Sequence, residues 1–243
     1  MKERVDALLV ARGLCDSREQ AKRLVLAGEV RSGDRLIEKP SVTLEADAPL
    51  EVKEKLKYVG RGGLKMEGAL EGFGIDVTGL ICADIGASTG GFTDCLLQRG
   101  AAKVHAVDVG TNQLAWKIRS DPRVVVKEKF NARHMVPDDL GDPIALAVMD
   151  LSFISLTKVL PAVFSVLGEG GQVVCLIKPQ FELQADDLGK GGIVKNPALY
   201  TQVEQRVRQA CQAAGLDVLD WFASAIHGGD GNQEFFIHAR RAA

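Results

Sequence analysis

Hydrophobic and polar residues follow two different patterns along this 243-residue chain. In the first pattern, apolar residues recur at helical spacing over two short segments that end at Gly13 and Gly28. Ser17 and Gln20 form a capping box at the start of the second segment. Short strands follow at residues 30–37 and 50–52. The first part of the chain therefore predicts a small α+β unit.

The second pattern is a regular alternation of strand-length apolar runs with helical segments. Strands are predicted at residues 80–85, 103–108, 123–127, 144–150 and 172–178. Helices are predicted at residues 64–73, 91–99, 112–120, 155–167 and 197–214. This alternation predicts an α/β domain whose mostly parallel sheet is covered on both faces. Residues 216–223 and 234–239 flank a turn and predict a final hairpin-like return.

A charged, glycine-bearing run at residues 53–63 separates the two patterns. It predicts a small domain at residues 1–58, a linker at 59–63 and a large domain at 64–243. The longest apolar runs are strand-length and interrupted by charge, so we expect no membrane helix. The N-terminal segment is charged and amphipathic, unlike a signal peptide, and this predicts a cytoplasmic protein.

The composition of the chain bears on metal binding and on nucleic-acid binding. The five cysteines and four histidines are scattered, with no Cys-x-x-Cys pair and no paired histidine spacing, so we expect reduced thiols and no metal site. The formal net charge of −2 gives no overall basic signature. Nucleic-acid binding would therefore depend on local basic patches.

The run ADIGASTGGFTD at residues 83–94 lies between a predicted strand and a predicted helix, where α/β proteins bind nucleotide-like cofactors. No lysine follows Gly91, which excludes a phosphate-binding P-loop. Ser88 stands where a dinucleotide fingerprint has its second glycine, which disfavours NAD and FAD. An adenosine-containing ligand without phosphates remains, and S-adenosylmethionine fits that description. A purely structural turn is the alternative.

The loop and the following strands supply the candidate cofactor-binding residues. Asp108 ends the next predicted strand, 24 residues (108 minus 84) beyond Asp84 and close to the ~20 expected for a ribose-binding carboxylate. A strand-end aspartate is also common as a helix cap. The predicted cofactor-binding residues are Asp84, Gly86, Ser88, Gly90, Gly91, Phe92, Asp108 and Asp150.

Four charged residues lie at the ends of predicted elements in the large domain. Asp150 and Lys178 end two strands, Lys65 opens the first helix, and Glu234 begins the last strand. The carboxyl ends of parallel strands are where α/β sites form. A single charge at such an end often simply faces water. Only the set as a whole therefore predicts a site.

As a set, Lys65, Asp150, Lys178 and Glu234 resemble the Lys-Asp-Lys-Glu tetrad of FtsJ-type ribose 2′-O-methyltransferases. The runs GRGGLK, DIGASTGGFTD, MDLSFISL, LIKPQFE and GNQEF resemble the TlyA family, also called hemolysin A, over essentially the whole chain. The resemblance implies a Rossmann-like methyltransferase fold with an antiparallel last strand and S-adenosylmethionine as cofactor. It also implies that the partner is ribosomal RNA or a ribosomal subunit, methylated on a ribose 2′-hydroxyl, usually of cytidine.

The run RVDALLVARGLCDSREQAKRLVLAGEV at residues 4–30, with a hairpin and Lys39-Pro40-Ser41 after it, resembles the S-four-type RNA-binding domain. Members of that family bind structured RNA with the face of their two helices. A solvated surface alone would also explain the basic residues here. The RNA-binding residues that the resemblance implies are Arg4, Arg18, Lys22, Arg23 and Arg31.

The implied reaction needs alignment and help with a proton. Holding the reactants in line can supply about 7–11 kcal/mol, whereas a positioned base gives about 10²–10⁴-fold, so alignment carries more of the rate. Our hypothesis is that Lys178 contacts the 2′-hydroxyl, either as base or as a charge that stabilises the developing alkoxide. Asp150 is expected to orient Lys178, and Lys65 and Glu234 to complete the network.

Two further segments carry expectations. Residues 184–196 predict a mobile loop over the site, with a plain surface loop as the alternative. Lys57-Tyr58-Val59 occupies the place of a linker motif that couples RNA docking to cofactor binding in relatives. The competing functions are a membrane-active hemolysin-like protein, an RNA base methyltransferase and a noncatalytic RNA-binding factor. The target nucleotide, the ribosomal subunit and the oligomeric state lie beyond the sequence.

Overall fold

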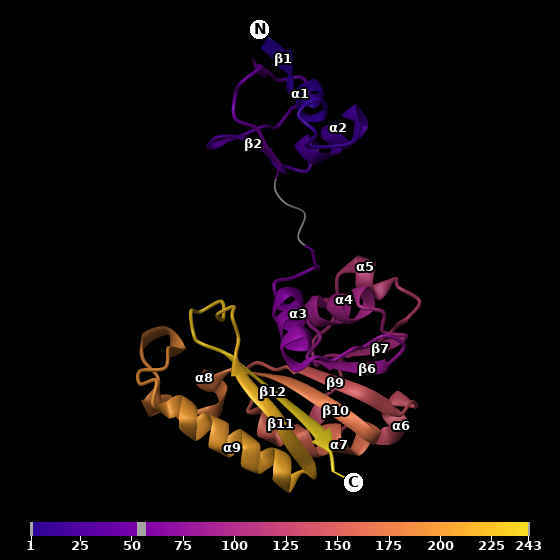
Figure 1. Ribbon diagram of the computed structural model, residues 1–243, viewed down its shortest axis with the longest axis vertical. Coiled ribbons are helices and arrows are strands. Elements are labelled where there is room, and N and C mark those ends of the chain that lie inside the picture. Colours follow the sequence, from indigo (N-terminus) through magenta and orange to yellow (C-terminus); the bar gives the residue numbers. More distant parts are fainter. Residues whose placement is uncertain (1, 53–56, 243) are drawn as a thin grey trace. The chain divides into compact units, whose positions relative to one another are not determined.

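The computed structural model describes residues 2–52 and 57–242 of the chain. Contacts divide the chain into two compact units, residues 1–56 and 57–243 (Figure 1). The small unit has one hydrophobic core, and the large unit has two. Residues 53–56 of the predicted charged run lie outside the described residues.

The small unit combines two helices with short antiparallel strands. Its elements are β1 (Lys2–Arg4), α1 (Val5–Ala11), α2 (Arg18–Leu26), β2 (Val30–Ser32), β3 (Arg35–Leu36), β4 (Thr43–Glu45) and β5 (Glu51–Val52). Leu9 and Val25 belong to the core between α1 and α2. The Gln20 backbone N–H donates to Ser17 Oγ at 3.2 Å, so the predicted cap forms. β2 and β3 form the predicted hairpin, with Gly33 at φ +56° in its turn.

A seven-stranded sheet in the order β11-β12-β10-β9-β6-β7-β8 organises the large unit. Its strands are β6 (Ile81–Ile85), β7 (Lys103–Val107), β8 (Val124–Lys127), β9 (Ile144–Asp150), β10 (Leu167–Ile177), β11 (Leu216–Ala223) and β12 (Phe235–Arg241). The five strands from β10 to β8 are parallel, and β12 runs antiparallel to both of its neighbours. The predicted mostly parallel sheet and the antiparallel last strand are confirmed.

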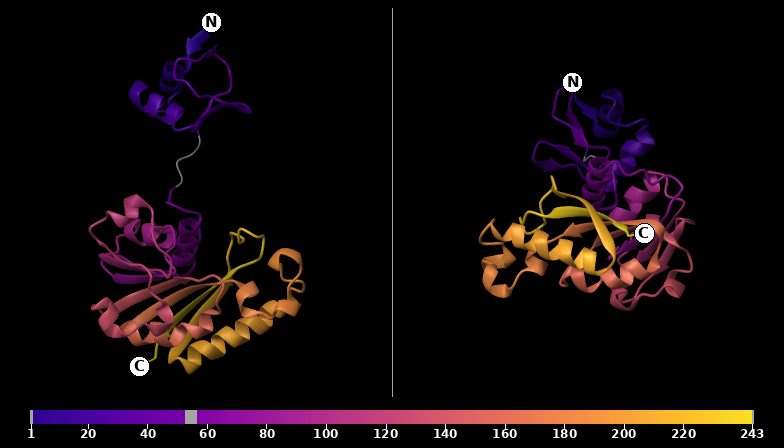
Figure 2. Two further views of the ribbon diagram at one scale, coloured as in Figure 1. Left: turned by 180° about the vertical axis from the view of Figure 1, so that it is seen from behind. Right: turned by 60° about the horizontal axis from the view of Figure 1, so that its bottom comes forward.

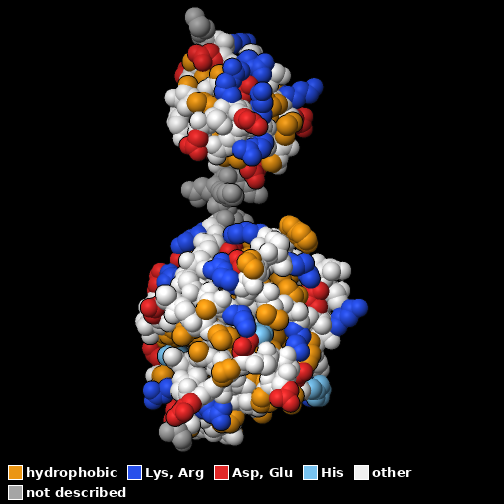
Figure 3. Space-filling view, turned by 90° about the vertical axis from the view of Figure 1, so that its right-hand side faces the viewer, with side chains coloured by type: hydrophobic (Ala, Val, Ile, Leu, Met, Phe, Trp, Pro, Cys, Tyr) orange, Lys and Arg blue, Asp and Glu red, His pale blue; other side chains and the backbone are white. Residues whose placement is uncertain are grey.

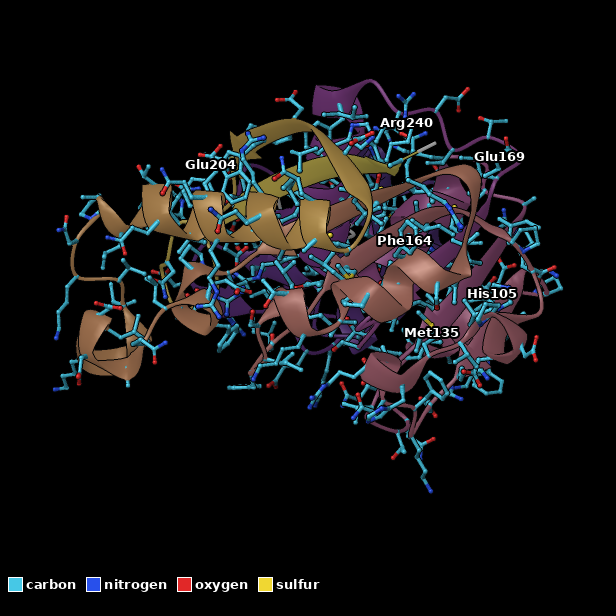
Figure 4. The ribbon with its side chains drawn as sticks, turned by 90° about the horizontal axis from the view of Figure 1, so that it is seen from below. His105, Met135, Phe164, Glu169, Glu204 and Arg240 are labelled. Atoms are coloured by element: carbon cyan, nitrogen blue, oxygen red, sulfur yellow. The ribbon has the colours of Figure 1, made fainter. Side chains whose placement is uncertain are left out.

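Helices cover both faces of this sheet, as the views in Figure 2 show. The helices are α3 (Gly62–Phe73), α4 (Gly91–Gln98), α5 (Trp116–Arg119), α6 (Pro137–Leu140), α7 (Leu160–Val166), α8 (Pro179–Glu182) and α9 (Leu199–Ala213). One core lies under α3 and α4, and the other lies under α7 and α9. Figure 4 views this second layer from below, with Phe164 on α7 and Glu204 on α9. Both strand faces are therefore buried, which explains the continuous apolar runs in the sequence.

Two predicted helices are shorter in the structure. The helix expected at 112–120 is reduced to α5, because Asp108 and Glu128 accept the backbone N–H groups of Gly110 and Asn112 and Asn112 has φ +57°. The helix expected at 155–167 is split into a 3-10 turn, Leu156–Lys158, and α7. Its last residue belongs to β10, which begins five residues before the predicted strand.

The segment 59–63, expected to be a linker, belongs partly to α3. Gly62 and Gly63 form the first turn of that helix. A Cβ on Gly63 would lie 2.3 Å from the Tyr58 ring, so only glycine lets the ring pack there. Tyr58 is 3% exposed and belongs to the core between the sheet, α3 and α4. The helix therefore starts before the predicted residue 64.

Candidate active site

A cavity lies at the edge of the sheet where the parallel strands β6, β7 and β9 end, and it is the main cavity of that edge. It has a volume of about 530 Å³ and is lined by Gly86, Ser88, Asp108, Asp150 and Phe153 among others. A smaller cavity of about 110 Å³ shares Gly86, Ser88 and Asp150 with it and reaches Asp84. The edge predicted from the strand ends is thus hollowed where the sequence expects a ligand.

Glycines shape the loop that forms the floor of these cavities. Gly86 has φ +87°, and a Cβ on it would lie 2.6 Å from the backbone oxygen of Asp150. Gly90, at φ +93°, precedes α4, and a Cβ there would lie 2.8 Å from a methyl group of Leu114. Gly91 packs against the backbone of Gly63. Side chains are absent at these points because neighbouring segments approach the loop too closely to admit them.

Asp84 is fully buried at the end of β6. Its Oδ2 accepts hydrogen bonds from the Thr93 backbone N–H at 2.9 Å and from Thr93 Oγ1 at 2.6 Å. Its Oδ1 has no hydrogen-bond partner among the described residues. Burial raises the pKa of the Asp84 carboxyl to about 7, against the opposing hydrogen bonds from Thr93. A cationic ligand group would satisfy the unpaired oxygen and stabilise the carboxylate.

Asp108 follows β7 and holds the loop from the other side. Its Oδ2 accepts the Ser88 backbone N–H at 2.7 Å, and its Oδ1 accepts the Gly110 N–H at 2.7 Å. Ser88 has φ +47°, an uncommon conformation for a residue with a side chain, and its hydroxyl donates to Gln113 Oε1 at 3.2 Å. Asp108 therefore fixes the strained loop while lining the main cavity.

Phe92 is buried, and its ring centroid lies 6.5 Å from that of Phe236 in the core. It also lines the smaller cavity. Of the predicted cofactor residues, all except Gly90 line one of the two cavities or both. Gly90 lies between lining residues in the loop. The structure therefore brings this predicted set together around two adjoining cavities.

Lys65 and Glu234 form a buried ion pair although they lie 169 residues apart. Lys65 comes from α3 and Glu234 from the residue before β12. Burial raises the pKa of the Glu234 carboxyl, whereas the pairing with Lys65 opposes that rise. Lys178 and Asp150 also act electrostatically on Glu234. The four predicted charges therefore form one interacting group.

Lys178 follows β10 directly, and its ammonium contacts two residues that follow or end the neighbouring strand β9. Its Nζ lies 2.6 Å from Asp150 Oδ1 and donates to Ser152 Oγ at 2.9 Å. The Lys178 side chain is 14% exposed and that of Asp150 is 27% exposed. An ammonium has three N–H donors, so one can still reach a ligand at the cavity rim.

Two residues of this site carry no individual prediction from the sequence, and a third, Asp94, supports the helix beside it. Ser152 and Phe153 lie in the run MDLSFISL, and Phe153 is 91% exposed with φ +64°. A bulky residue in that conformation is an outlier that functional sites tend to retain. Asp94 is buried in α4 and accepts the Val59 backbone N–H at 2.9 Å and Lys117 Nζ at 3.0 Å. The available sequence signal for Asp94 is an aspartate inside the otherwise largely apolar run FTDCLL at residues 92–97.

The small unit presents the predicted RNA-binding residues at its surface. Arg4, Arg18, Lys22, Arg23 and Arg31 are all exposed. Arg4 and Arg18 both contact Asp6, and Arg31 donates to the backbone oxygen of Asp34 at 3.0 Å. Figure 3 shows Lys and Arg side chains close together on one face of this unit, with acidic groups between them.

Two of the four histidines contact polar side chains. His105 Nε2 lies 2.8 Å from Asp142, and His238 Nε2 lies 2.6 Å from Gln172. In residues 2–52 and 57–242, no three His, Cys, Asp or Glu side chains are grouped to hold a metal ion. No helix in the same residues has both the length and the apolar character to cross a membrane.

The sheet order and the glycine loop define the fold of S-adenosylmethionine-dependent methyltransferases. A solved methyltransferase of that class from Mesorhizobium loti shares the fold at 16% identity, with a TM-score of 0.56 over 75% of this chain and 100% of that one. A family model for FtsJ-like methyltransferases matches residues 58–241, and one for the S4 domain matches residues 3–49. The chain belongs to the TlyA family of FtsJ-like methyltransferases.

Relatives align over nearly the whole chain. The 16S/23S rRNA (cytidine-2′-O)-methyltransferase TlyA of Mycobacterium tuberculosis is 45% identical over 98% of this chain and 90% of its own length. Hemolysin A of Brachyspira hyodysenteriae is 42% identical over 97% of this chain and 98% of its own. A solved structure from Streptococcus thermophilus is 46% identical, with a TM-score of 0.76 over 99% of this chain and 89% of that one.

Proposed function

We propose that this protein transfers a methyl group from S-adenosylmethionine to a ribose 2′-hydroxyl of ribosomal RNA, with cytidine as the expected nucleoside. The observation that carries the proposal is the group of two lysine–carboxylate pairs beside the cofactor cavities. The name of the Mycobacterium tuberculosis relative supports the same substrate and product. The proposed activity implies a cytoplasmic protein.

The residues around the cavities suit the cofactor. The unpaired Asp84 Oδ1 offers an acceptor for a positively charged group, and Asp108 lies at the nucleoside end expected from the sequence. The glycine loop leaves backbone accessible between them. When bound, S-adenosylmethionine supplies a methyl group that its sulfonium charge already activates. We therefore assign Asp84, Gly86, Ser88, Gly90, Gly91, Phe92, Asp108 and Asp150 to cofactor binding.

Lys178 is the group that we assign to the ribose hydroxyl. Asp150 and Ser152 contact the Lys178 ammonium. These contacts fix the direction of its remaining N–H donor. As the hydroxyl oxygen bonds to the methyl group its proton passes to bulk water, and the fixed ammonium stabilises the negative charge that develops on the oxygen. Lys65 and Glu234 neutralise each other and limit the charge that remains unbalanced around Lys178.

Phe153 supports an RNA substrate. It is 91% exposed, lines the same cavity as Asp150 and follows Ser152, the hydrogen-bond partner of Lys178. Unpaired bases stack on exposed aromatic side chains. We assign Phe153 to the nucleobase of the target nucleotide. A base held there would keep its ribose near Lys178.

The small unit is assigned to RNA docking. We propose that the small unit binds structured RNA and that the large unit carries out the transfer. The match of residues 3–49 to the S4 domain supports this division. Lys22 and Arg23 on α2, together with Arg4, Arg18 and Arg31, supply the positive charge for phosphates.

The experiment is methyl transfer from labelled S-adenosylmethionine to small and large ribosomal subunits, supplied separately. We expect label in ribosomal RNA that resists alkaline cleavage at the modified linkage, because a 2′-O-methyl group blocks attack by the hydroxyl. Lys178→Ala should lower the turnover by at least about 10²-fold while cofactor binding stays near the wild-type value. Label at fully alkali-sensitive positions would favour base methylation instead. Turnover of Lys178→Ala at the wild-type rate would refute its role.

A further inference from the structure

The carboxyl group of Asp6 in α1 is completely buried and binds two arginines. Its Oδ1 accepts from Arg4 Nε at 3.0 Å, and its Oδ2 accepts from Arg4 Nη2 at 3.1 Å and from Arg18 Nη2 at 3.0 Å. The two arginines come from different places, one before α1 and one at the start of α2. A buried carboxylate requires such partners, because an unpaired one would be costly.

The arginines remain available to a ligand while they are held. The Arg4 side chain is 46% exposed, and that of Arg18 is 57% exposed. A guanidinium has five N–H donors in a rigid plane, and Asp6 uses only part of each set. Arg12 differs, because its two terminal nitrogens donate to the backbone oxygens of Ala46 and Ala48. Asp6 thus orients two surface cations without enclosing them.

We propose that Asp6 is a positioning residue for RNA binding: it holds Arg4 and Arg18 as a paired guanidinium clamp for backbone phosphates. The inference rests on the proposed RNA-binding function of the small unit. Two long side chains that are already ordered lose less freedom when a phosphate binds. Guanidinium planes match phosphate oxygens in a two-pronged geometry, so their orientation matters as well as their charge.

The test separates positioning from charge, because the two predict opposite signs. Asp6→Asn removes one negative charge, and charge alone would strengthen RNA binding. Loss of the clamp should instead weaken binding to small- and large-subunit rRNA transcripts by about tenfold in a filter-binding assay with the full chain. Asp47→Asn is the matched control, an exposed residue of the small unit after β4. It should bind as tightly as wild type or slightly more tightly.

A variant cycle separates positioning from a general structural effect. In the Arg4→Ala/Arg18→Ala background, Asp6→Asn should cause no further loss of RNA affinity, because the groups it positions are gone. In methyl transfer, the single variant should raise the KM for RNA and leave kcat unchanged. Equal or tighter binding by Asp6→Asn, or an additional loss in that background, would overturn the inference.

Thermal unfolding and hydrogen exchange within residues 2–52 show whether the small unit of Asp6→Asn is folded. Should it fail to fold, Arg18→Lys decides: the charge stays, but the planar fork is lost. We then expect RNA affinity to fall about fivefold, and unchanged affinity would contradict the clamp. Methyl transfer by the wild-type chain tests the proposed function separately. If the wild-type chain methylates rRNA and Asp6→Asn binds rRNA as tightly as the wild type, the clamp is refuted and the proposed function stands.

Discussion

At the scale of single residues, the site depends on groups whose environment changes their chemistry. Asp84 is the most direct case, because burial raises its pKa to about 7 while one oxygen stays unpaired. In the protein without cofactor, the folded state keeps a proton that the unfolded state releases. The free energy of unfolding of the protein without cofactor should therefore fall as the pH rises from about 4 to about 7.

Cofactor binding should also depend on the protonation of Asp84, but in the opposite direction, with affinity that rises with pH. A positive group beside Asp84 favours its carboxylate, so binding releases a proton below about pH 7. The affinity for S-adenosylmethionine should rise with pH by at most about tenfold per unit up to about pH 7 and then level off. Calorimetry in buffers of different ionisation enthalpy measures the proton release. Asp84→Asn should abolish this dependence, whereas Asp138→Asn, an exposed control, should keep it. A flat profile in the wild type would contradict the assignment.

Phe153 allows a test in which stability and activity move in opposite directions. A bulky residue at φ +64° stores about 1–3 kcal/mol of strain, so Phe153→Gly should leave the free energy of unfolding unchanged or raise it. Loss of base stacking should weaken RNA methylation by about 1–3 kcal/mol. Denaturant unfolding and kcat/KM for RNA measure the two effects. Phe181→Leu serves as control. The Phe181 ring centroid lies 5.2 Å from that of Phe153, but Phe181 is half-buried whereas Phe153 is exposed. Full activity of Phe153→Gly would remove Phe153 from the site.

At the scale of elements, one residue ties the glycine-containing loop to the start of β12. Asn232 is buried, accepts the Val194 backbone N–H at 3.0 Å and donates to the Gly192 backbone oxygen at 3.0 Å. It also donates to Asp230 at 2.9 Å. The sequence predicts a mobile loop at residues 184–196, and these contacts connect the loop to a residue two positions before Glu234.

Asn232→Ala should release this loop. We expect hydrogen exchange at residues 189–194 to become faster and methyl transfer to fall, because Glu234 loses its neighbouring support. Asn196→Ala is the matched control within the loop, because among residues 2–52 and 57–242 its side chain accepts only the Ala198 backbone N–H, at 3.0 Å. Exchange that rises equally in both variants would show that Asn232 is not the residue that fixes the loop.

At the scale of the whole molecule, the sequence predicted the order of elements well because local patterns determine it. Apolar runs with glycine turns predicted the strands, and the four charged ends predicted residues that the structure brings together. Contacts distant in sequence could not be predicted this way: nothing local joins Lys65 to Glu234, or Asp6 to Arg18. Backbone strain at Phe153 also lacks a sequence signature. The shortened helix α5 reflects side chains that capture backbone N–H groups before the helix can form.

The central claim concerns the atom that receives the methyl group. Ribosomal RNA treated with the wild-type protein and S-adenosylmethionine should be digested to nucleosides and analysed by mass spectrometry. The account predicts a nucleoside whose added methyl group remains with the ribose fragment while the base fragment, expected to be cytosine, keeps its normal mass. A methyl group on the base fragment, or no methylated nucleoside with either ribosomal subunit as substrate, would contradict it.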